Sequence, residues 1–293
     1  MKVAVLGPIT KDTVIFDGIS QMNMGGIPYF EANVLKALGA EVEAFITYAR
    51  EDEEWVKENF LGIKIYSIYA DQTLEGDLLY SPEDPDTRRI IRLKYGPNII
   101  SPEEDLINTL RNFDYILLGP LYYENIHHEF FEKLKDKNLV LGNFGLFTYH
   151  ENGNMVWKNP EKLVQVAKFL KYLFLDEKEI KFVAQKETTE ECAEYFLFLG
   201  VKIVAITGGS KGSLIFTKDK KYTIPAFPVK TLADPTGAGD TYVAAFIFAT
   251  SLFDDIQKQG EFAAMVATMV VEKRGAFNGN LETVLTRLKE FQK

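Results

Sequence analysis

Small residues and two aspartates share one short segment, residues 234–240, which reads Asp-Pro-Thr-Gly-Ala-Gly-Asp and leads into an apolar stretch at residues 241–249. This pattern predicts a turn followed by a buried helix, and the first N–H groups of a helix have no partners within it. Because Gly237, Ala238 and Gly239 carry almost no side chain, a phosphate can approach these N–H groups closely, and the helix dipole favours its negative charge. The segment therefore predicts an anion-binding turn.

Asp240 ends this segment, and its negative charge would repel a bound anion, so its carboxylate needs another task. Accepting a proton from an attacking hydroxyl group is the chemistry that a carboxylate can perform there. In phosphoryl transfer the protein mainly positions the reactants and neutralises charge, while a carboxylate orients and deprotonates the acceptor alcohol. The alternative is that the glycines only permit tight packing and that Asp240 caps the helix. The segment alone leaves both interpretations open.

The elements that must position this turn follow an alternating pattern. Short apolar runs predict buried strands at residues 3–6, 115–118, 139–141 and 203–206. Between these runs lie stretches with helical periodicity, for example residues 29–38 and 160–173. The alternation predicts a doubly wound α/β fold with a mostly parallel sheet. Ligands of such folds bind at the carboxyl ends of the strands, where we expect the turns at residues 7–8, 119–120, 142–145 and 207–209.

One region breaks the alternation. Residues 63–100 contain short β-rich pieces separated by proline and aspartate. We interpret this region as an antiparallel outgrowth that joins the N-terminal part of the chain in a small β lid, formed by about residues 12–24 and 63–100. The alternative is a surface hairpin with no ligand role. Without a linker or an internal repeat, the sequence predicts one compact domain over residues 1–293.

Three arginines of the expected lid, Arg88, Arg89 and Arg92, could reach an anionic substrate, or could protect an exposed strand edge. His127 and His128 stand near two glutamates, but adjacent histidines on a helix point in different directions, so we expect no metal site there.

Composition narrows the possible partners and the compartment. The formal charge is −9 and no long basic cluster occurs, which argues against a nucleic-acid partner. No apolar stretch reaches the roughly 20 residues that span a bilayer, and the N-terminus reads as a buried strand and not as a signal peptide. The single cysteine, Cys192, fits a reducing compartment. We therefore expect a cytoplasmic protein with no membrane partner. No P-loop and no acyl-transfer motif is present.

Residues 234–240 and the small-residue stretch after them resemble the C-terminal signature of the ribokinase (PfkB) family of carbohydrate kinases. Further segments resemble family landmarks in the family's order and cover essentially the whole chain. These segments are Asp12 after the first strand, the glycine pair and helix at residues 25–28 with the Leu-Gly-Ala ending at residues 38–40, the nucleotide loop at residues 207–212, and the end of the adenine-side helix at residues 273–276.

The resemblance implies a ribokinase-like α/β kinase that phosphorylates an alcohol group with ATP, and it assigns roles to individual residues. Asp240 would be the base, and the N–H groups of Gly237, Ala238 and Gly239 would form the anion hole. The acceptor would contact Asp12, Gly25, Gly26 and Phe30; the nucleotide would contact Thr207, Gly209, Gly212, Asp176 and Gly275. Mg²⁺ would be organised through water by Glu179 and Asp176. The resemblance also suggests a monovalent cation such as K⁺ near Asp234, and a homodimer through the lid.

Three departures from the family pattern affect these roles. Asp176 replaces the asparagine of an Asn-x-x-Glu element, which adds negative charge near the phosphates; the alternative is an acidic helix start. Phe30 replaces a common asparagine, so hydrogen bonds to hydroxyls are lost and an apolar or stacking surface is gained, although Phe30 could equally be core. Residues 142–145, Gly-Asn-Phe-Gly, stand where many members have an aspartate. We therefore expect a sugar or polyol kinase, with a nucleoside kinase or a catalytically silent ligand sensor as alternatives.

Overall fold

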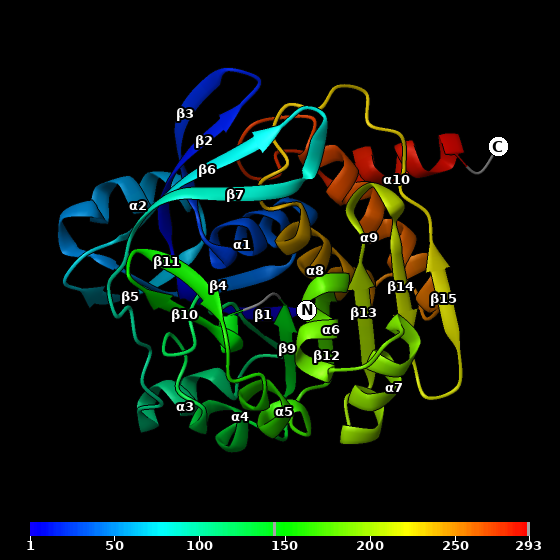
Figure 1. Cartoon of the computed structure of the whole chain (residues 1–293), viewed down its shortest axis with the longest axis horizontal. Coiled ribbons are helices and arrows are strands. Elements are labelled where there is room, and N and C mark those ends of the chain that lie inside the picture. Colours follow the sequence, from blue (N-terminus) through cyan, green and yellow to red (C-terminus); the bar gives the residue numbers. More distant parts are fainter. Residues whose placement is uncertain (143–144, 292–293) are drawn as a thin grey trace.

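The computed structural model describes residues 1–142 and 145–291, whose strands form one large and two small sheets (Figure 1). The large sheet has nine strands in the order β15-β14-β13-β12-β9-β8-β1-β4-β5. The pairs from β5 to β13 are parallel, and β14 and β15 continue the sheet antiparallel. Its strands are β1 (Lys2–Pro8), β4 (Glu41–Ala49), β5 (Lys64–Ala70), β8 (Tyr115–Leu118), β9 (Asn138–Gly142), β12 (Tyr172–Asp176), β13 (Ile203–Thr207), β14 (Ser213–Phe216) and β15 (Lys221–Ile224).

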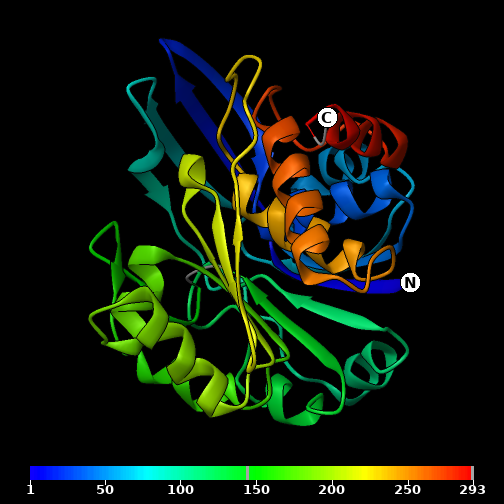
Figure 2. The same ribbon diagram turned by 90° about the vertical axis from the view of Figure 1, so that its right-hand side faces the viewer.

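Helices cover both faces of this sheet (Figure 2). Strand β1 shows why, because Val3 and Val5 belong to one hydrophobic core while Ala4 and Leu6 belong to the other. The first core contains α1 (Ile27–Leu38), α2 (Glu53–Asn59), α8 (Ala238–Ala249), α9 (Ile256–Val270) and α10 (Leu281–Phe291). The second contains α3 (Glu104–Leu110), α4 (Glu129–Lys133), α5 (Glu161–Ala167), α6 (Glu177–Ala184) and α7 (Thr189–Leu199). Within the described residues, no helix combines the length and the hydropathy needed to cross a membrane.

The predicted α/β class with a large, mostly parallel sheet is confirmed, and so are the four strands expected from their apolar runs. The helix expected at residues 160–173 is too long. Helix α5 ends at Ala167, and Tyr172 already begins β12. The run 172–175 is buried from both faces as a central strand, and periodicity cannot separate such a strand from a buried helix.

A four-stranded sheet in the order β3-β2-β6-β7 stands where the β lid was expected, and we call this sheet the lid. Its strands are β2 (Thr10–Phe16), β3 (Ile19–Gly25), β6 (Leu74–Ser81) and β7 (Asp84–Lys94). Two expectations about this lid are wrong. Residues 64–70 form β5 of the large sheet, and β2 pairs with β6 in parallel. The reason is connectivity, because the chain passes through α1, β4 and β5 between β2 and β6, so no hairpin joins these two strands.

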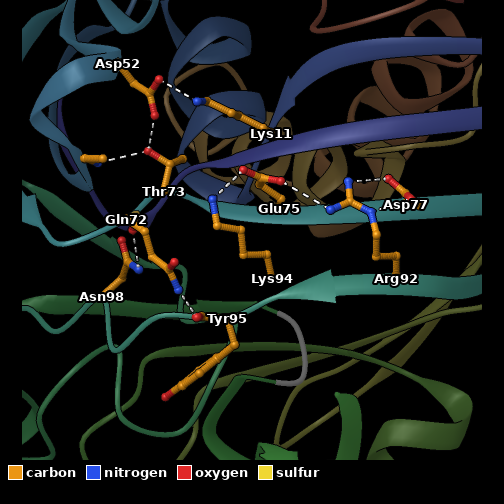
Figure 3. Close-up of polar contacts among 11 residues, drawn as sticks. Lys11, Asp52, Gln72, Thr73, Glu75, Asp77, Arg92, Lys94, Tyr95 and Asn98 are labelled. Carbon is orange, nitrogen blue, oxygen red and sulfur yellow. Dashed lines mark hydrogen bonds and ion pairs between the residues drawn. The ribbon is translucent and has the colours of Figure 1, made fainter.

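Polar contacts join the start of the lid strands β2 and β6 to the segment that follows β4 of the large sheet (Figure 3). Asp52 accepts a hydrogen bond of 2.5 Å from the Thr73 hydroxyl and lies 2.5 Å from the Lys11 ammonium group. Arg92 pairs with Asp77 and Glu75 on the lid itself. The side chains of Arg88 and Arg89 lie outside what the structure describes. Arg92 therefore forms ion pairs that link β7 to β6.

A second small sheet, the hairpin of β10 (Thr148–Glu151) and β11 (Asn154–Trp157), follows the short helix at residues 145–147. Sequence reasoning missed this hairpin. The sequence did contain a signal, because the pair Asn152-Gly153 between two strands is a strong hairpin signal. In the structure these two residues have the positive φ angles, 50° and 81°, that such a turn requires.

Helix α10 is attached to the body of the protein by a buried ion pair. Arg287 donates to both carboxylate oxygens of Glu272 at 2.5 and 2.6 Å and to the Pro228 carbonyl at 3.2 Å. We expect Arg287→Ala to lower the free energy of unfolding by about 3 kcal/mol, because the largely buried carboxylate of Glu272 would lose its cation. Urea denaturation measures this loss. The exposed Lys289→Ala on the same helix should change stability by less than about 0.5 kcal/mol. Equal losses in the two variants would contradict this account of Arg287.

Candidate active site

A pocket lies where the lid meets the carboxyl ends of β1 and β8 and the start of α8. The structure brings five of the predicted site residues to its wall: Asp12, Gly26, Phe30, Gly237 and Asp240. They come from β2, from the turn before α1, from α1 and from α8, so residues more than 200 positions apart in the sequence meet there.

Asp12 enters this pocket from β2, and its side chain is buried. Gly25 makes room for it, because a Cβ atom at Gly25 would lie only 1.9 Å from Asp12 Oδ2. Gly26 then takes a φ of 90° as the N-cap of α1. The glycine pair thus allows the start of α1 and the carboxylate of Asp12 to share one end of the pocket.

The turn before α8 has the conformation that its sequence predicts. Gly237 is the N-cap with a left-handed φ of 75°, and no described side chain caps the helix there. A Cβ atom at Gly237 would lie 2.3 to 2.4 Å from the ring of Phe30. Asp240 stands in the first turn and is not the N-cap, so the interpretation of Asp240 as a helix cap is wrong. Its half-buried side chain lines the pocket.

Phe30 satisfies both interpretations that its sequence left open. It is 3% exposed, and its ring packs edge-on against Tyr29 with centroids 5.0 Å apart. The same ring lies under Gly237 and forms part of the pocket wall. Phe30 is therefore a core residue whose ring also lines the pocket.

Glu31, the next residue of α1, is a buried acid that sequence reasoning missed. It is 1% exposed, and its Oε2 atom has no hydrogen-bond partner among the described residues. Burial, and then the negative charge of Asp240, raise the pKa of Glu31 well above its ordinary value of 4.5. No motif marks this position, which looks like one more polar residue in a helix.

The raised pKa of Glu31 predicts a pH-dependent stability difference. Above pH 4.5 the unfolded chain releases this proton while the folded protein retains it, so the wild type loses about 1.4 kcal/mol of unfolding free energy per pH unit until the folded pKa is reached. Gln has no proton to lose. The advantage of Glu31→Gln over the wild type should therefore grow as the pH rises above 4.5, in urea denaturation from pH 4 to 8. The exposed Glu194→Gln is the control. A Glu31→Gln difference that is constant over this range would contradict the raised pKa.

None of the residues expected to contact nucleotide lines this pocket, and all of them except Gly275 lie at or just after the ends of β12 and β13. Asp176 and Thr207 are register partners in these adjacent parallel strands. Gly209 and Gly212 follow in a tight loop with φ values of 55° and 88°, closed by a hydrogen bond of 2.8 Å from the Gly208 N–H to the Gly212 carbonyl. Gly275, after α9, has a φ of 81° and lies beside the Tyr29 hydroxyl.

The lid forms hydrogen bonds with three segments: the loop after β13, the turn before α8 and the segment after α9. Asp86 accepts hydrogen bonds from the N–H of Ser210 at 3.2 Å and from its hydroxyl at 2.6 Å. Thr236 donates to the Tyr80 hydroxyl at 3.4 Å. Arg274 donates to Gln21 at 3.2 Å. The lid therefore spans from the pocket to the loop after β13.

Asp176 and Glu179 form a capping box at the start of α6. The Glu179 N–H donates to Asp176 Oδ1 at 2.8 Å, and the Asp176 N–H donates to Glu179 Oε2 at 2.7 Å. This geometry fits the alternative interpretation, in which the two acidic residues begin the helix. It does not test their role in organising Mg²⁺, and that role stays a prediction. The carboxylate oxygens are ligands of the kind that Mg²⁺ prefers.

Asp234 is 3% exposed and accepts a hydrogen bond of 2.9 Å from the N–H of Thr236. Burial raises the pKa of Asp234, and hydrogen bonds from Thr236 oppose this rise. The cation site near Asp234 stays a prediction.

His127 and His128 differ from expectation. Their ring centroids lie 4.5 Å apart, and with Glu129 they form an exposed group whose polar atoms lie within 4.8 Å of one another. The reason is that α4 begins only at Glu129, so the two histidines stand in the turn before it. Exposed groups of this kind are common without a metal, and we assign this one no role. Asn143 and Phe144, where many family members place an aspartate, lie outside the described residues.

Comparisons with known proteins bear on both the fold and the family. Residues 147–283 match the model of the pfkB family carbohydrate kinases. A nucleoside kinase of Methanocaldococcus jannaschii is 34% identical over 160 residues, which is 54% of this chain and 51% of that enzyme. The chain thus matches about half the length of this relative.

Solved structures share the whole fold. A pyrophosphate-dependent kinase in the ribokinase family, complexed with a pyrophosphate analogue and myo-inositol, has a TM-score of 0.78 and 20% identity, with 97% of this chain and 99% of that chain covered. A ribokinase from Thermotoga maritima has a TM-score of 0.76 and 24% identity, with 98% and 99% covered.

Proposed function

We propose that the chain is a carbohydrate kinase of the pfkB family, and that it transfers the terminal phosphoryl group of ATP to an alcohol group of a small hydroxylated molecule, a sugar or polyol in the broadest sense. One observation carries the proposal: a carboxylate, Asp240, lines a pocket at the start of a helix whose N-cap is a glycine with no side chain in the way. Asp12 supplies a second carboxylate in the same pocket.

In this mechanism Asp12 accepts hydrogen bonds from acceptor hydroxyls and so orients them. Asp240 takes the proton of the attacking hydroxyl while the oxygen of that hydroxyl bonds to the γ-phosphorus. The bond between this phosphorus and the β–γ bridging oxygen breaks, which releases ADP. The N–H groups of Gly237, Ala238 and Gly239 donate to the moving phosphoryl group and offset its negative charge. Proton transfer and charge stabilisation thus come from one turn.

On the donor side we propose that Thr207, Gly209, Gly212 and Gly275 contact the nucleotide. Asp176 and Glu179 would hold, through water, a Mg²⁺ ion that would neutralise phosphate charge of the bound ATP. The resemblance to the family is also the basis on which we propose a K⁺ ion near the buried Asp234. A homodimer through the lid is supported by the exposed Ile19 and Met22 on its edge strand β3, which are 56% and 65% exposed.

The experiment that tests this function is an ADP-release assay with Mg²⁺-ATP and a panel of sugars, polyols and nucleosides, preceded by a thermal-shift screen of the same panel. The proposal expects ADP formation with at least one compound that also raises the melting temperature. If a compound binds but never leads to ADP, the chain is a ligand sensor on a kinase fold. The departures at Phe30 and Asp176 are the features that would favour that second function.

A further inference from the structure

Tyr242 lies on the side of α8 opposite Asp240. Two residues along a helix correspond to a rotation of about 200°, so the helix presents Asp240 to the pocket and Tyr242 to the large sheet. There the Tyr242 ring packs edge-on against Phe174 of β12, with ring centroids 6.3 Å apart and planes 69° apart. Tyr242 is 5% exposed. Its side chain is therefore enclosed between the helix and the strands of the sheet.

The hydroxyl of Tyr242 shares a buried hydrogen bond with the hydroxyl of Ser213, with the two oxygens 2.7 Å apart. Ser213 begins β14 directly after the tight loop at residues 208–212, and it is the register partner of Thr207. The bond therefore joins the helix that carries Asp240 to the base of the loop that we expect to contact nucleotide.

The apolar pattern of α8 does not by itself fix how this helix is rotated about its axis. Every residue from 241 to 249 is buried, so no polar face distinguishes one rotation from another. A buried hydrogen bond does distinguish them, because a rotation that breaks it leaves two hydroxyl groups away from water without each other. The bond between Tyr242 and Ser213 therefore selects one rotation of α8, and with it the direction of Asp240.

We infer that Tyr242 is a positioning residue, whose bond to Ser213 holds the turn before α8 and the loop at residues 208–212 in the arrangement that one ATP molecule requires. This inference rests on the proposed function for the identity of the ligand. Tyr242 does not line the pocket, so it acts through the N–H groups at the start of α8 and through the loop. Without the bond, the two segments would still form but would shift relative to each other.

Tyr115 provides a matched control. Its hydroxyl lies 3.0 Å from the hydroxyl of Thr250, the C-cap residue of α8, and so forms the same kind of bond at the other end of the helix. Tyr242→Phe and Tyr115→Phe each remove one tyrosine hydroxyl and keep the ring. Both variants should lose some stability, whereas the loss of positioning should be confined to Tyr242→Phe. Melting temperatures verify that each variant is folded.

The first measurement needs no ligand. Hydrogen–deuterium exchange, followed by mass spectrometry well below the melting temperatures, compares the wild type with the two variants. Tyr242→Phe should raise the exchange rates of peptides that contain residues 208–213 and 237–241 by about three- to tenfold, because the bond no longer opposes local opening. Tyr115→Phe should leave both peptides unchanged.

The second measurement is the affinity for Mg²⁺-ATP by isothermal titration calorimetry. Tyr242→Phe should bind ATP about tenfold more weakly than the wild type, and Tyr115→Phe should bind it equally well. The double variant Tyr242→Phe/Ser213→Ala separates positioning from stability. It removes the hydroxyl that Tyr242→Phe leaves buried without this partner, so the melting temperature should return toward that of the wild type. Its ATP affinity should stay low, because the bond is still missing.

The inference is overturned if the two single variants change exchange equally, if exchange at residues 208–213 stays at the wild-type rate in Tyr242→Phe, or if ATP affinity recovers with the melting temperature in the double variant. Equal ATP affinity in the wild type and all variants would also overturn it and would leave the proposed function standing. A wild type that does not bind Mg²⁺-ATP would contradict the proposed function, and the exchange rates would still decide whether this bond holds the two segments.

Discussion

Replacing Asp240 by Asn should lower kcat by about 10² to 10⁴-fold and leave ATP affinity unchanged or slightly stronger. The amide keeps the size of the side chain but cannot accept the proton of the acceptor hydroxyl. Its neutrality also removes repulsion between the carboxylate and the phosphates. Single-turnover kinetics measure the chemical step, and calorimetry measures ATP binding, so the two effects are separated.

The matched control for this variant is Asp254→Asn, the same exchange at an exposed position between α8 and α9. It should keep wild-type kcat. If Asp240→Asn also keeps a kcat within a few-fold of the wild type, Asp240 is not the base and the proposed mechanism fails. If it loses ATP binding together with kcat, the residue holds the nucleotide site together and has no special role in proton transfer.

Gly237→Ala is the second substitution from which we expect a large effect. The added methyl group would lie 2.3 to 2.4 Å from the ring of Phe30, and the left-handed φ of 75° disfavours any residue with a Cβ by about 1 kcal/mol. Either Phe30 or the turn must move, which displaces the N–H groups that hold the phosphoryl group. We expect kcat to fall by about 10² to 10³-fold, the range for loss of a preorganised donor.

Gly18→Ala isolates the backbone contribution. Gly18 has nearly the same φ, 73°, but a Cβ atom there would meet nothing within 4 Å. Gly18→Ala should therefore show a small loss of stability and full activity. Equal kcat values for Gly237→Ala and the wild type would contradict the role of the turn, whatever the change in stability.

Sequence alone predicted the elements whose signal is local. The strand at residues 115–118 is a short apolar run with clear ends, and the turn at Gly237 needs a glycine for its φ. The class of the fold followed from the alternation of such elements. The pocket residues Asp12, Phe30 and Asp240 were found because motifs marked them, although their roles remain proposals.

Other features depend on contacts that no local pattern encodes. Strand β5 was assigned to the lid because it is one of the short β-rich pieces of residues 63–100, and only its pairing with β4 places it in the large sheet. Glu31 becomes notable only when α1 packs against α8 and buries it near Asp240. Met155 reaches the pocket because the hairpin folds back beside the lid. Each of these depends on long-range packing, which a periodicity argument does not contain.

A crystal structure with a non-hydrolysable ATP analogue and a bound acceptor tests the central claim most directly. We predict that the terminal phosphate contacts the N–H groups at the start of α8, and that one acceptor hydroxyl lies about 2.6 to 3.2 Å from an Asp240 carboxylate oxygen. A terminal phosphate bound elsewhere, or an acceptor hydroxyl directed away from Asp240, would contradict the account.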